Sequence, residues 1–126
     1  MVELKKKIEL KALIIDDEID ICYLLKNILK NKNIEANYVG SISEAKRFLT
    51  LYFPTIIFLD NHLPDGLGVE FLKDIKIMNP NIIVIFISGH ATMLFKDIAI
   101  GAGAAFFIDK PFTTECINSM LDSFWE

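Results

Sequence analysis

The sequence has 126 residues, 52% of them hydrophobic, which is enough to bury the core of one globular domain over residues 1–126. The 13 basic and 17 acidic residues give a net charge of −4, and this mild acidity argues against direct binding to nucleic acid, which needs a basic surface. No apolar run approaches the roughly 20 residues of a membrane span, and residues 1–10 lack an apolar core of signal-peptide length, so we expect a cytoplasmic protein without membrane contact.

The chain first predicts two strands and two helices. Residues 12–15 form a strand without polar alternation, so both of its faces should be buried. Three acids follow it: Asp16, Asp17 and Glu18. The next helix has an apolar face at helical spacing, made of Ile21, Leu24, Leu25 and Ile28. Residues 34–39 predict a more polar strand at an edge of the sheet. A capping box at Ser41 and Glu44 opens a second helix. Its apolar face is Ala45, Phe48, Leu49 and Tyr52, ahead of Pro54.

The middle of the chain predicts two more strands with a helix between them. Residues 55–59 form a strand that ends on Asp60. The turn-forming residues after it predict a loop: Asn61, Pro64, Asp65, Gly66 and Gly68. The third helix carries the apolar residues Phe71, Leu72, Ile75 and Met78 and ends at Asn79. Residues 82–87 are the most apolar strand, which we expect at the centre of the sheet, and they lead to Ser88.

The last part of the chain predicts a helix, a strand and a helix. The fourth helix spans about residues 91–100, and the fifth strand, residues 104–108, leads to Lys110. Thr113 caps a final helix with the apolar residues Cys116, Ile117, Met120, Leu121 and Phe124. The two cysteines, Cys22 and Cys116, each fall within a helical pattern, and we expect both to be buried, reduced thiols because a metal site needs more ligands at closer spacing.

Strict alternation of five strands and five helices indicates a parallel sheet with right-handed crossovers and helices on both faces. We therefore expect an α/β fold, a flavodoxin-like (βα)5 doubly wound parallel sheet with strand order 2-1-3-4-5. In that order the first, third, fourth and fifth strands are contiguous. Their carboxyl ends bring the following polar residues to one crevice: Asp16, Asp17, Asp60, Ser88 and Lys110.

This set of residues predicts a particular chemistry. A strand-end carboxylate alone would be explained by solvation, and acids before a helix would be explained by its dipole. Three carboxylates that share a pocket repel one another and need a compensating cation, and all-oxygen ligation suits Mg²⁺. The Lys110 ammonium and the Ser88 hydroxyl can each hold a phosphate oxygen, which leaves Asp60 as a nucleophile that forms an aspartyl phosphate. The sequence therefore predicts a Mg²⁺-assisted phosphoaspartate site.

With these residues the whole sequence resembles the receiver domain of two-component response regulators, with a chemotaxis-regulator-like fold. The motifs are the Asp16-Asp17 pair, Asp60 followed by Leu63-Pro64 and Gly68, Ser88-Gly89, and Lys110-Pro111. The segments LPDGLG and SGHAT are most similar to receivers of nitrogen-regulation-type transcriptional activators. The resemblance implies that the protein is a phosphoprotein switch and not an enzyme, since it catalyses only its own phosphorylation and dephosphorylation.

The resemblance also implies a role for each site residue. Asp60 accepts the phosphoryl group from the phosphohistidine of a sensor histidine kinase or a histidine phosphotransfer protein. Asp17 and Asp60 ligate Mg²⁺ directly, with the backbone carbonyl of His62, and Asp16 helps through water. Ser88 and Lys110 contact the phosphoryl group, and Phe107 is the aromatic switch that swings inward when Ser88 moves. The side chains of His62 and His90 flank the pocket and tune the phosphoryl lifetime, unless each is simply an exposed loop residue.

Two other functions are open to a chain of this kind. A Mg²⁺-dependent phosphatase with an aspartate nucleophile usually has a second acid two residues later, but here that residue is His62, and no cap domain is present. An interaction module that has lost phosphorylation would not need the complete set of acids together with Ser88 and Lys110. Both alternatives therefore fit the sequence less well than a switch.

The expected partner surface is the fourth helix, the fifth strand and the last helix. The fourth helix has two sets of apolar residues, which cannot all point inward on a helix of 3.6 residues per turn. If Met93, Ala99 and Ile100 point inward, then Leu94, Phe95 and Ile98 cannot all do so. Phe106 and Phe107 should point to opposite faces of their strand. Part of this set should be exposed and support a homodimer, unless the helix is rotated or partly unwound. The output domain or target lies outside this chain, which is either a stand-alone receiver or the first domain of a larger regulator.

Overall fold

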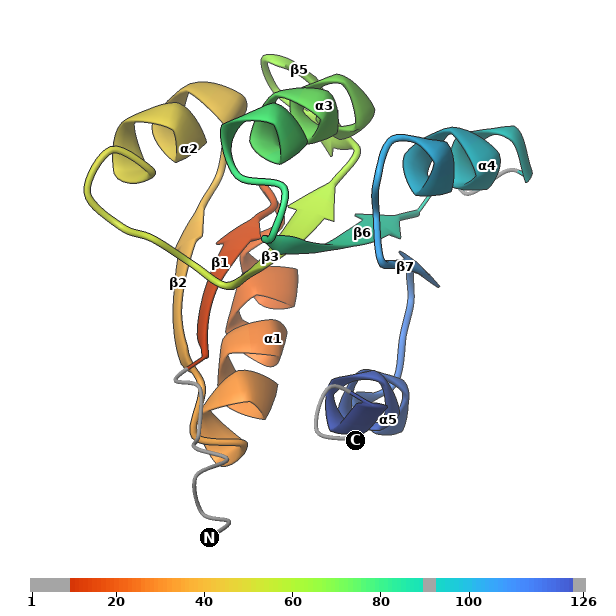
Figure 1. Cartoon of the computed structure of the whole chain (residues 1–126). Coiled ribbons are helices and arrows are strands. Elements are labelled where there is room, and N and C mark those ends of the chain that lie inside the picture. The colour runs from red at the N-terminus through yellow and green to blue at the C-terminus, as the bar shows by residue number, and fades with distance from the viewer. Residues whose placement is uncertain (1–9, 90–92, 124–126) are drawn as a thin grey trace, which may run out of the picture.

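A five-stranded parallel sheet forms the centre of the computed structural model, which describes residues 10–89 and 93–123 (Figure 1). Its strands are β1 (Lys11–Ile15), β2 (Glu35–Val39), β3 (Ile56–Asp60), β6 (Ile83–Ser88) and β7 (Phe106–Asp109). The order β2-β1-β3-β6-β7 is the predicted order 2-1-3-4-5, and each pair of neighbours is parallel. The flavodoxin-like fold is therefore confirmed, with the more polar second strand at an edge.

Five helices cover the two faces of this sheet (Figure 1). They are α1 (Ile19–Asn31), α2 (Ile42–Phe48), α3 (Gly68–Met78), α4 (Met93–Gly101) and α5 (Thr114–Asp122). Side chains of α1 and α5 pack on one face, and those of α2, α3 and α4 on the other. Strand residues alternate between the two layers, so Ile14 and Phe58 belong to the first and Leu13 and Ile57 to the second. No helix in the described ranges is long and apolar enough to cross a membrane.

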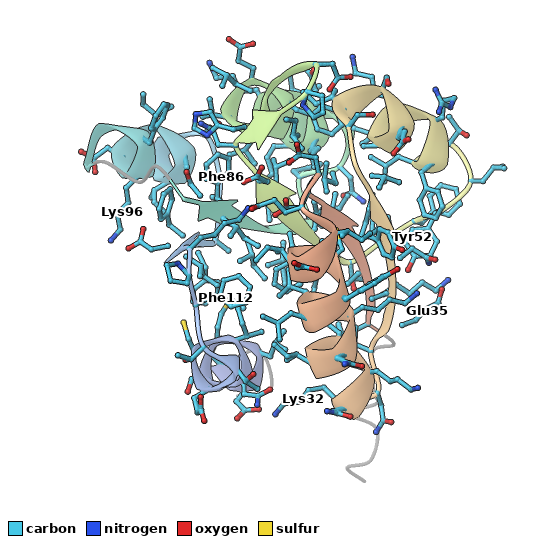
Figure 2. The ribbon with its side chains drawn as sticks, turned by 180° about the vertical axis from the view of Figure 1, so that it is seen from behind. Lys32, Glu35, Tyr52, Phe86, Lys96 and Phe112 are labelled. Atoms are coloured by element: carbon cyan, nitrogen blue, oxygen red, sulfur yellow. The ribbon has the colours of Figure 1, made fainter. Side chains whose placement is uncertain are left out.

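The helix boundaries follow capping residues. Glu44 N–H donates to Ser41 Oγ at 3.1 Å, and Gly40 N–H donates to Glu44 Oε1 at 2.8 Å, which is the predicted capping box. Thr113 caps α5 by accepting from Cys116 N–H at 3.0 Å, while Phe124 lies outside the described residues. The C-terminal ends of α1 and α5 are joined by an ion pair. Lys32, which follows α1, reaches toward α5, where its ammonium lies 2.7 Å from the Asp122 carboxylate (Figure 2).

Most residues of the predicted helical faces pack in the core, including Leu49 and Tyr52 beyond the end of α2, but single residues differ from the prediction. The buried face of α1 is Cys22, Leu25, Ile28 and Leu29, whereas Leu24 is exposed. Two sets of apolar residues at helical spacing overlap on this helix, and periodicity alone does not show which set is buried. Helix α2 ends at Phe48, because Thr50 Oγ1 donates to the Arg47 carbonyl and the chain turns there. Met78, at the frayed end of α3, is 55% exposed. Cys22 is buried as expected, but Cys116 is exposed.

Candidate functional site

The polar residues that end the central strands converge at one edge of the sheet. Asp16 follows β1, Asp60 ends β3, Ser88 ends β6 and Lys110 follows β7. The parallel register sets this edge, since Asp60 pairs with Ile87 and Ser88 with Asp109. Asp16, Asp60 and Ser88 are buried, and Lys110 N–H donates to the Ser88 carbonyl at 2.9 Å. These residues therefore lie together at one edge of the sheet, as the strand order predicted.

Three carboxylates at this edge form a group that fits a divalent cation. One oxygen each from Asp16, Asp17 and Asp60 lies within 4.8 Å of the others. Asp16 Oδ1 accepts the Glu18 N–H at 2.9 Å, whereas within the described residues the buried Oδ2 has an ion pair with Lys110 at 2.9 Å but no hydrogen bond of good geometry. A buried carboxylate oxygen of this kind keeps a lone pair for another partner, and an all-oxygen set suits Mg²⁺. The residues present therefore fit the predicted cation.

Lys110 is the positive charge of the site. Its Nζ lies 2.9 Å from Asp16 Oδ2, 3.2 Å from Asp60 Oδ1 and 2.5 Å from Glu18 Oε1. The first two contacts join the lysine to buried acids that the sequence assigned to the site. The third partner, Glu18, was given no site role by the sequence, because nothing in a linear pattern joins residues 92 positions apart. The Lys110-Pro111 peptide bond is cis.

Burial and charge shift the pKa values of the buried acids upward. Burial raises the pKa of Asp60 to about 6, the nearby Asp16 charge adds to this rise, and the Lys110 ammonium opposes it. Burial also raises the pKa of Asp16, opposed by the Glu18 N–H and by Lys110. Burial alone would lower the pKa of Lys110, but the carboxylates of Glu18 and Asp16 raise it above its usual range. The lysine therefore stays charged at neutral pH.

The segment after Asp60 is not the predicted loop but a short antiparallel hairpin of β4 (His62–Leu63) and β5 (Gly66–Leu67). Asn61 is fully buried at its start. The Asn61 carbonyl accepts the Gly68 N–H at 2.7 Å, and its Oδ1 accepts the Val69 N–H at 3.0 Å. Asn61 therefore accepts the first two N–H groups of α3 although Leu67 occupies the N-cap position, a contact for which the sequence gives no signal.

Asp65 connects the turn of this hairpin to α2. Its carboxylate accepts the N–H groups of Ile42 and Ser43, both at 2.9 Å. These hydrogen bonds hold the pKa of Asp65 below its usual range. The segment from Asn61 to Asp65 is thus hydrogen-bonded to the N-terminal ends of two helices, α2 and α3.

The aromatic residues near the site lie on both layers. Phe107 is half-buried, and its ring centroid lies 5.6 Å from that of Phe86, which is buried on β6 (Figure 2). Phe106 packs in the opposite layer, so the predicted alternation is confirmed. The exposed His62 ring meets the ring of Phe95 on α4 edge to face at 6.2 Å. His90 lies outside the described residues.

The sequence is also similar to known proteins. The family model of the response regulator receiver domain matches residues 12–122, which run from β1 to the end of α5. The chain belongs to this family. As a receiver, it is 36% identical over 105 residues to the nitrogen assimilation regulatory protein NtrX of Azorhizobium caulinodans, a match that covers 82% of the chain and 23% of that relative. The receiver thus spans under a quarter of this relative's length.

Solved receiver structures are similar in both fold and sequence. The receiver domain of NtrX from Brucella abortus has a TM-score of 0.82 and 31% identity, covering 89% of this chain and 95% of that one. The NtrC4 receiver domain, solved as a beryllofluoride-activated dimer, has a TM-score of 0.85 and 33% identity, covering 90% and 93%. These similarities confirm the predicted resemblance of this receiver to receivers of the nitrogen-regulation type.

Helix α4 of the receiver carries exposed apolar side chains. Ile98 is 39% exposed, Ile100 is exposed, and Ala99 between them is buried. Phe95 is half-buried, and the side chain of Leu94 lies outside the described part of the structure. The prediction that part of the apolar set is exposed is therefore confirmed for Ile98. Ile100, which the sequence placed inward, points to solvent as well.

Proposed function

We propose that residues 1–126 form one receiver domain in which Asp60 accepts a phosphoryl group in a Mg²⁺-dependent reaction. The observation that carries this proposal is the position of the Asp60 carboxylate. It ends a buried strand, and one of its oxygens lies within 4.8 Å of an oxygen of Asp16 and of an oxygen of Asp17. Its Oδ1 also lies 3.2 Å from Lys110 Nζ. A carboxylate in this position has a nucleophilic oxygen, an acidic pair for a cation and a charged donor for the incoming group.

Each residue has a role in this reaction. Asp16, Asp17 and Asp60 would hold Mg²⁺ together with the His62 backbone carbonyl, and the bound ion supplies positive charge that offsets the charge of the phosphoryl group. Asp60 attacks in its ionised form, which a bound cation and Lys110 both favour. An Asp60 oxygen–phosphorus bond forms as the donor's phosphorus–nitrogen bond breaks, and that electron pair returns to the donor imidazole. Lys110 and Ser88 then donate hydrogen bonds to the phosphoryl oxygens.

The proposed output is a change on the surface formed by α4, β7 and α5. Ser88 ends β6, and Phe107 on the neighbouring strand packs against Phe86 of β6. A displacement of Ser88 toward the phosphoryl group would open space for the Phe107 ring and alter this surface. The beryllofluoride-activated NtrC4 receiver is a dimer, which supports a homodimer of this receiver, and we assign the interface to this surface. The donor is a histidine kinase or histidine phosphotransfer protein, and the side chains of His62 and His90 tune the phosphoryl lifetime.

Phosphorylation with a small donor tests this function. Incubation with acetyl phosphate and Mg²⁺ should add one phosphoryl mass to the protein, and hydroxylamine should remove it. EDTA should prevent the gain, and Asp60→Asn should abolish it. An exposed aspartate outside the site, Asp74→Asn, is the matched control and should behave as wild type. Hydroxylamine-labile phosphate at the wild-type level in Asp60→Asn would show that another residue is the acceptor.

A further inference from the structure

Glu18 makes a contact that its place in the chain does not explain. It precedes α1 at the N-cap position, but its side chain makes no capping hydrogen bond. Its carboxylate instead meets the Lys110 ammonium at 2.5 Å, although its side chain is 60% exposed to solvent. An exposed carboxylate that leaves a helix terminus to reach a site lysine is in a position to affect what that lysine does.

We infer that Glu18 is a positioning residue that competes with the phosphoryl group for Lys110. Within the described ranges, the carboxylates at ion-pair distance from Lys110 are those of Asp16, Glu18 and Asp60. An ammonium has three N–H donors, and the three carboxylates at this distance compete for them. A phosphoryl oxygen on Asp60 therefore has to compete with Glu18 for Lys110. This inference rests on the proposed function of Asp60.

The structure indicates which carboxylate withdraws. Asp16 and Asp60 are buried at the ends of strands, where the proposed cation would hold them in place. Glu18 is exposed and has a longer side chain, so its carboxylate can turn into water at little cost. Glu18 therefore stabilises the resting position of Lys110, and its release is part of the phosphorylation step. Its negative charge also repels an anionic phosphodonor.

The sign of the effect follows from this competition. Glu18→Gln keeps the size of the side chain but removes the charge that holds Lys110. The rate of phosphorylation by acetyl phosphate at saturating Mg²⁺ should rise roughly two- to fivefold, the range that one exposed ion pair spans. Glu18→Asp keeps the charge but shortens the reach by one methylene, and it should also be faster than wild type. An effect of charge alone would instead leave Glu18→Asp at the wild-type rate.

Asp20→Asn is the matched control. Asp20 lies in the first turn of the same helix and carries the same charge, but it is not among the carboxylates that pair with Lys110. Its removal should leave the rate within experimental error of wild type. If Asp20→Asn is as fast as Glu18→Gln, or if Glu18→Gln is no faster than wild type, the inference is wrong while the phosphoacceptor function stands.

A second measurement does not depend on phosphorylation. Urea unfolding in EDTA of Glu18→Gln, Lys110→Met and the double variant gives the coupling between the two side chains. Glu18→Gln should lower the unfolding midpoint in the wild-type background and leave it unchanged when Lys110 is Met. Equal shifts in both backgrounds would show that the two side chains are not coupled and overturn the inference. A wild type that gains no phosphate would overturn the proposed function, and the inference with it.

Discussion

Gly68 lies against the backbone of Asp60, so closely that a methyl group at Gly68 would be 2.1 Å from the Asp60 carbonyl oxygen. Gly68 is also the first residue of α3, and its N–H donates to the carbonyl of Asn61. The start of this helix therefore fixes the main chain of Asp60. Any side chain at position 68 must displace the strand end that carries Asp60.

The first prediction concerns this contact. Gly68→Ala should lower the free energy of unfolding by roughly 1–3 kcal/mol, as overpacking a buried position does. It should also slow phosphorylation, because Asp60 moves relative to Lys110. Urea unfolding and acetyl phosphate labelling measure the two effects. Gly101→Ala is the control, since a methyl group there meets nothing within 4 Å. Equal stability of the two variants would contradict the prediction.

The second prediction concerns the buried cap of α3. Asn61→Ala removes the oxygen that accepts the Val69 N–H and should lower the free energy of unfolding by roughly 0.5–2 kcal/mol. Asn79→Ala is the matched control, because Asn79 Oδ1 also accepts one backbone N–H, from Asn81, but at an exposed position. Urea unfolding should show the larger loss for Asn61→Ala. A smaller loss than at Asn79 would mean that the Asn61 contact does not stabilise α3.

The third prediction is the pH dependence of stability without metal. The pKa of Asp60 rises from 3.8 to about 6 on folding, so between these values the folded protein binds more protons than the unfolded chain. Its contribution therefore makes stability fall as pH rises from about 4 to about 6, by roughly 2 kcal/mol. Asp60→Asn should remove this fall and be the more stable protein at pH 7. Urea unfolding in EDTA across this range measures the difference, and parallel pH profiles would refute it.

Asp65 should act in the opposite direction, since its pKa is lowered on folding. Its contribution to stability is present above the unfolded pKa and is lost as pH falls through the folded value. The wild-type pH profile is therefore a sum of opposing terms. Only the difference between the wild-type and Asp60→Asn profiles isolates the contribution of Asp60 to stability.

The fourth prediction concerns the surface of α4. With beryllofluoride and Mg²⁺, sedimentation should show a dimer of the wild type and a monomer of Ile98→Asp, because Ile98 is exposed on the proposed interface. Ile98 is a better probe than Phe95, whose ring packs against His62. Ile77→Asp is the control, since Ile77 is an 81% exposed isoleucine on α3 and should still dimerise. Dimers of both variants would place the interface elsewhere.

The positions of Asp16, Asp60, Ser88 and Lys110 could be predicted from sequence because they depend on only two features. Each residue ends a run of apolar residues that is readable as a strand, and parallel strands place their carboxyl ends at one edge. Neither feature depends on exact packing. The alternation of elements predicted a parallel sheet, and the flavodoxin-like strand order brought the four residues to one edge of it.

Other features depended on contacts between distant segments and could not be predicted. Asn61 reads as a turn residue, and its burial arises only when α3 packs on the end of β3. The pairing of Glu18 with Lys110 joins the segments that follow β1 and β7, two strands that β3 and β6 separate in the sheet. The buried face of α1 was misplaced because Cys22 and Leu29 extend one apolar stripe while Ile21 and Leu24 extend another.

The two cysteines differ in a way that gives the protein a natural attachment point for a reporter group. Cys22 is buried, its thiol donates to the Asp16 carbonyl at 3.3 Å, and burial raises its pKa to about 12. Cys116 is exposed in the first turn of α5. Because thiol reagents attack the accessible thiolate, a maleimide fluorophore or nitroxide will modify Cys116 and spare Cys22. The wild-type chain therefore accepts a single spectroscopic label beside the α4, β7 and α5 surface, without any engineered cysteine.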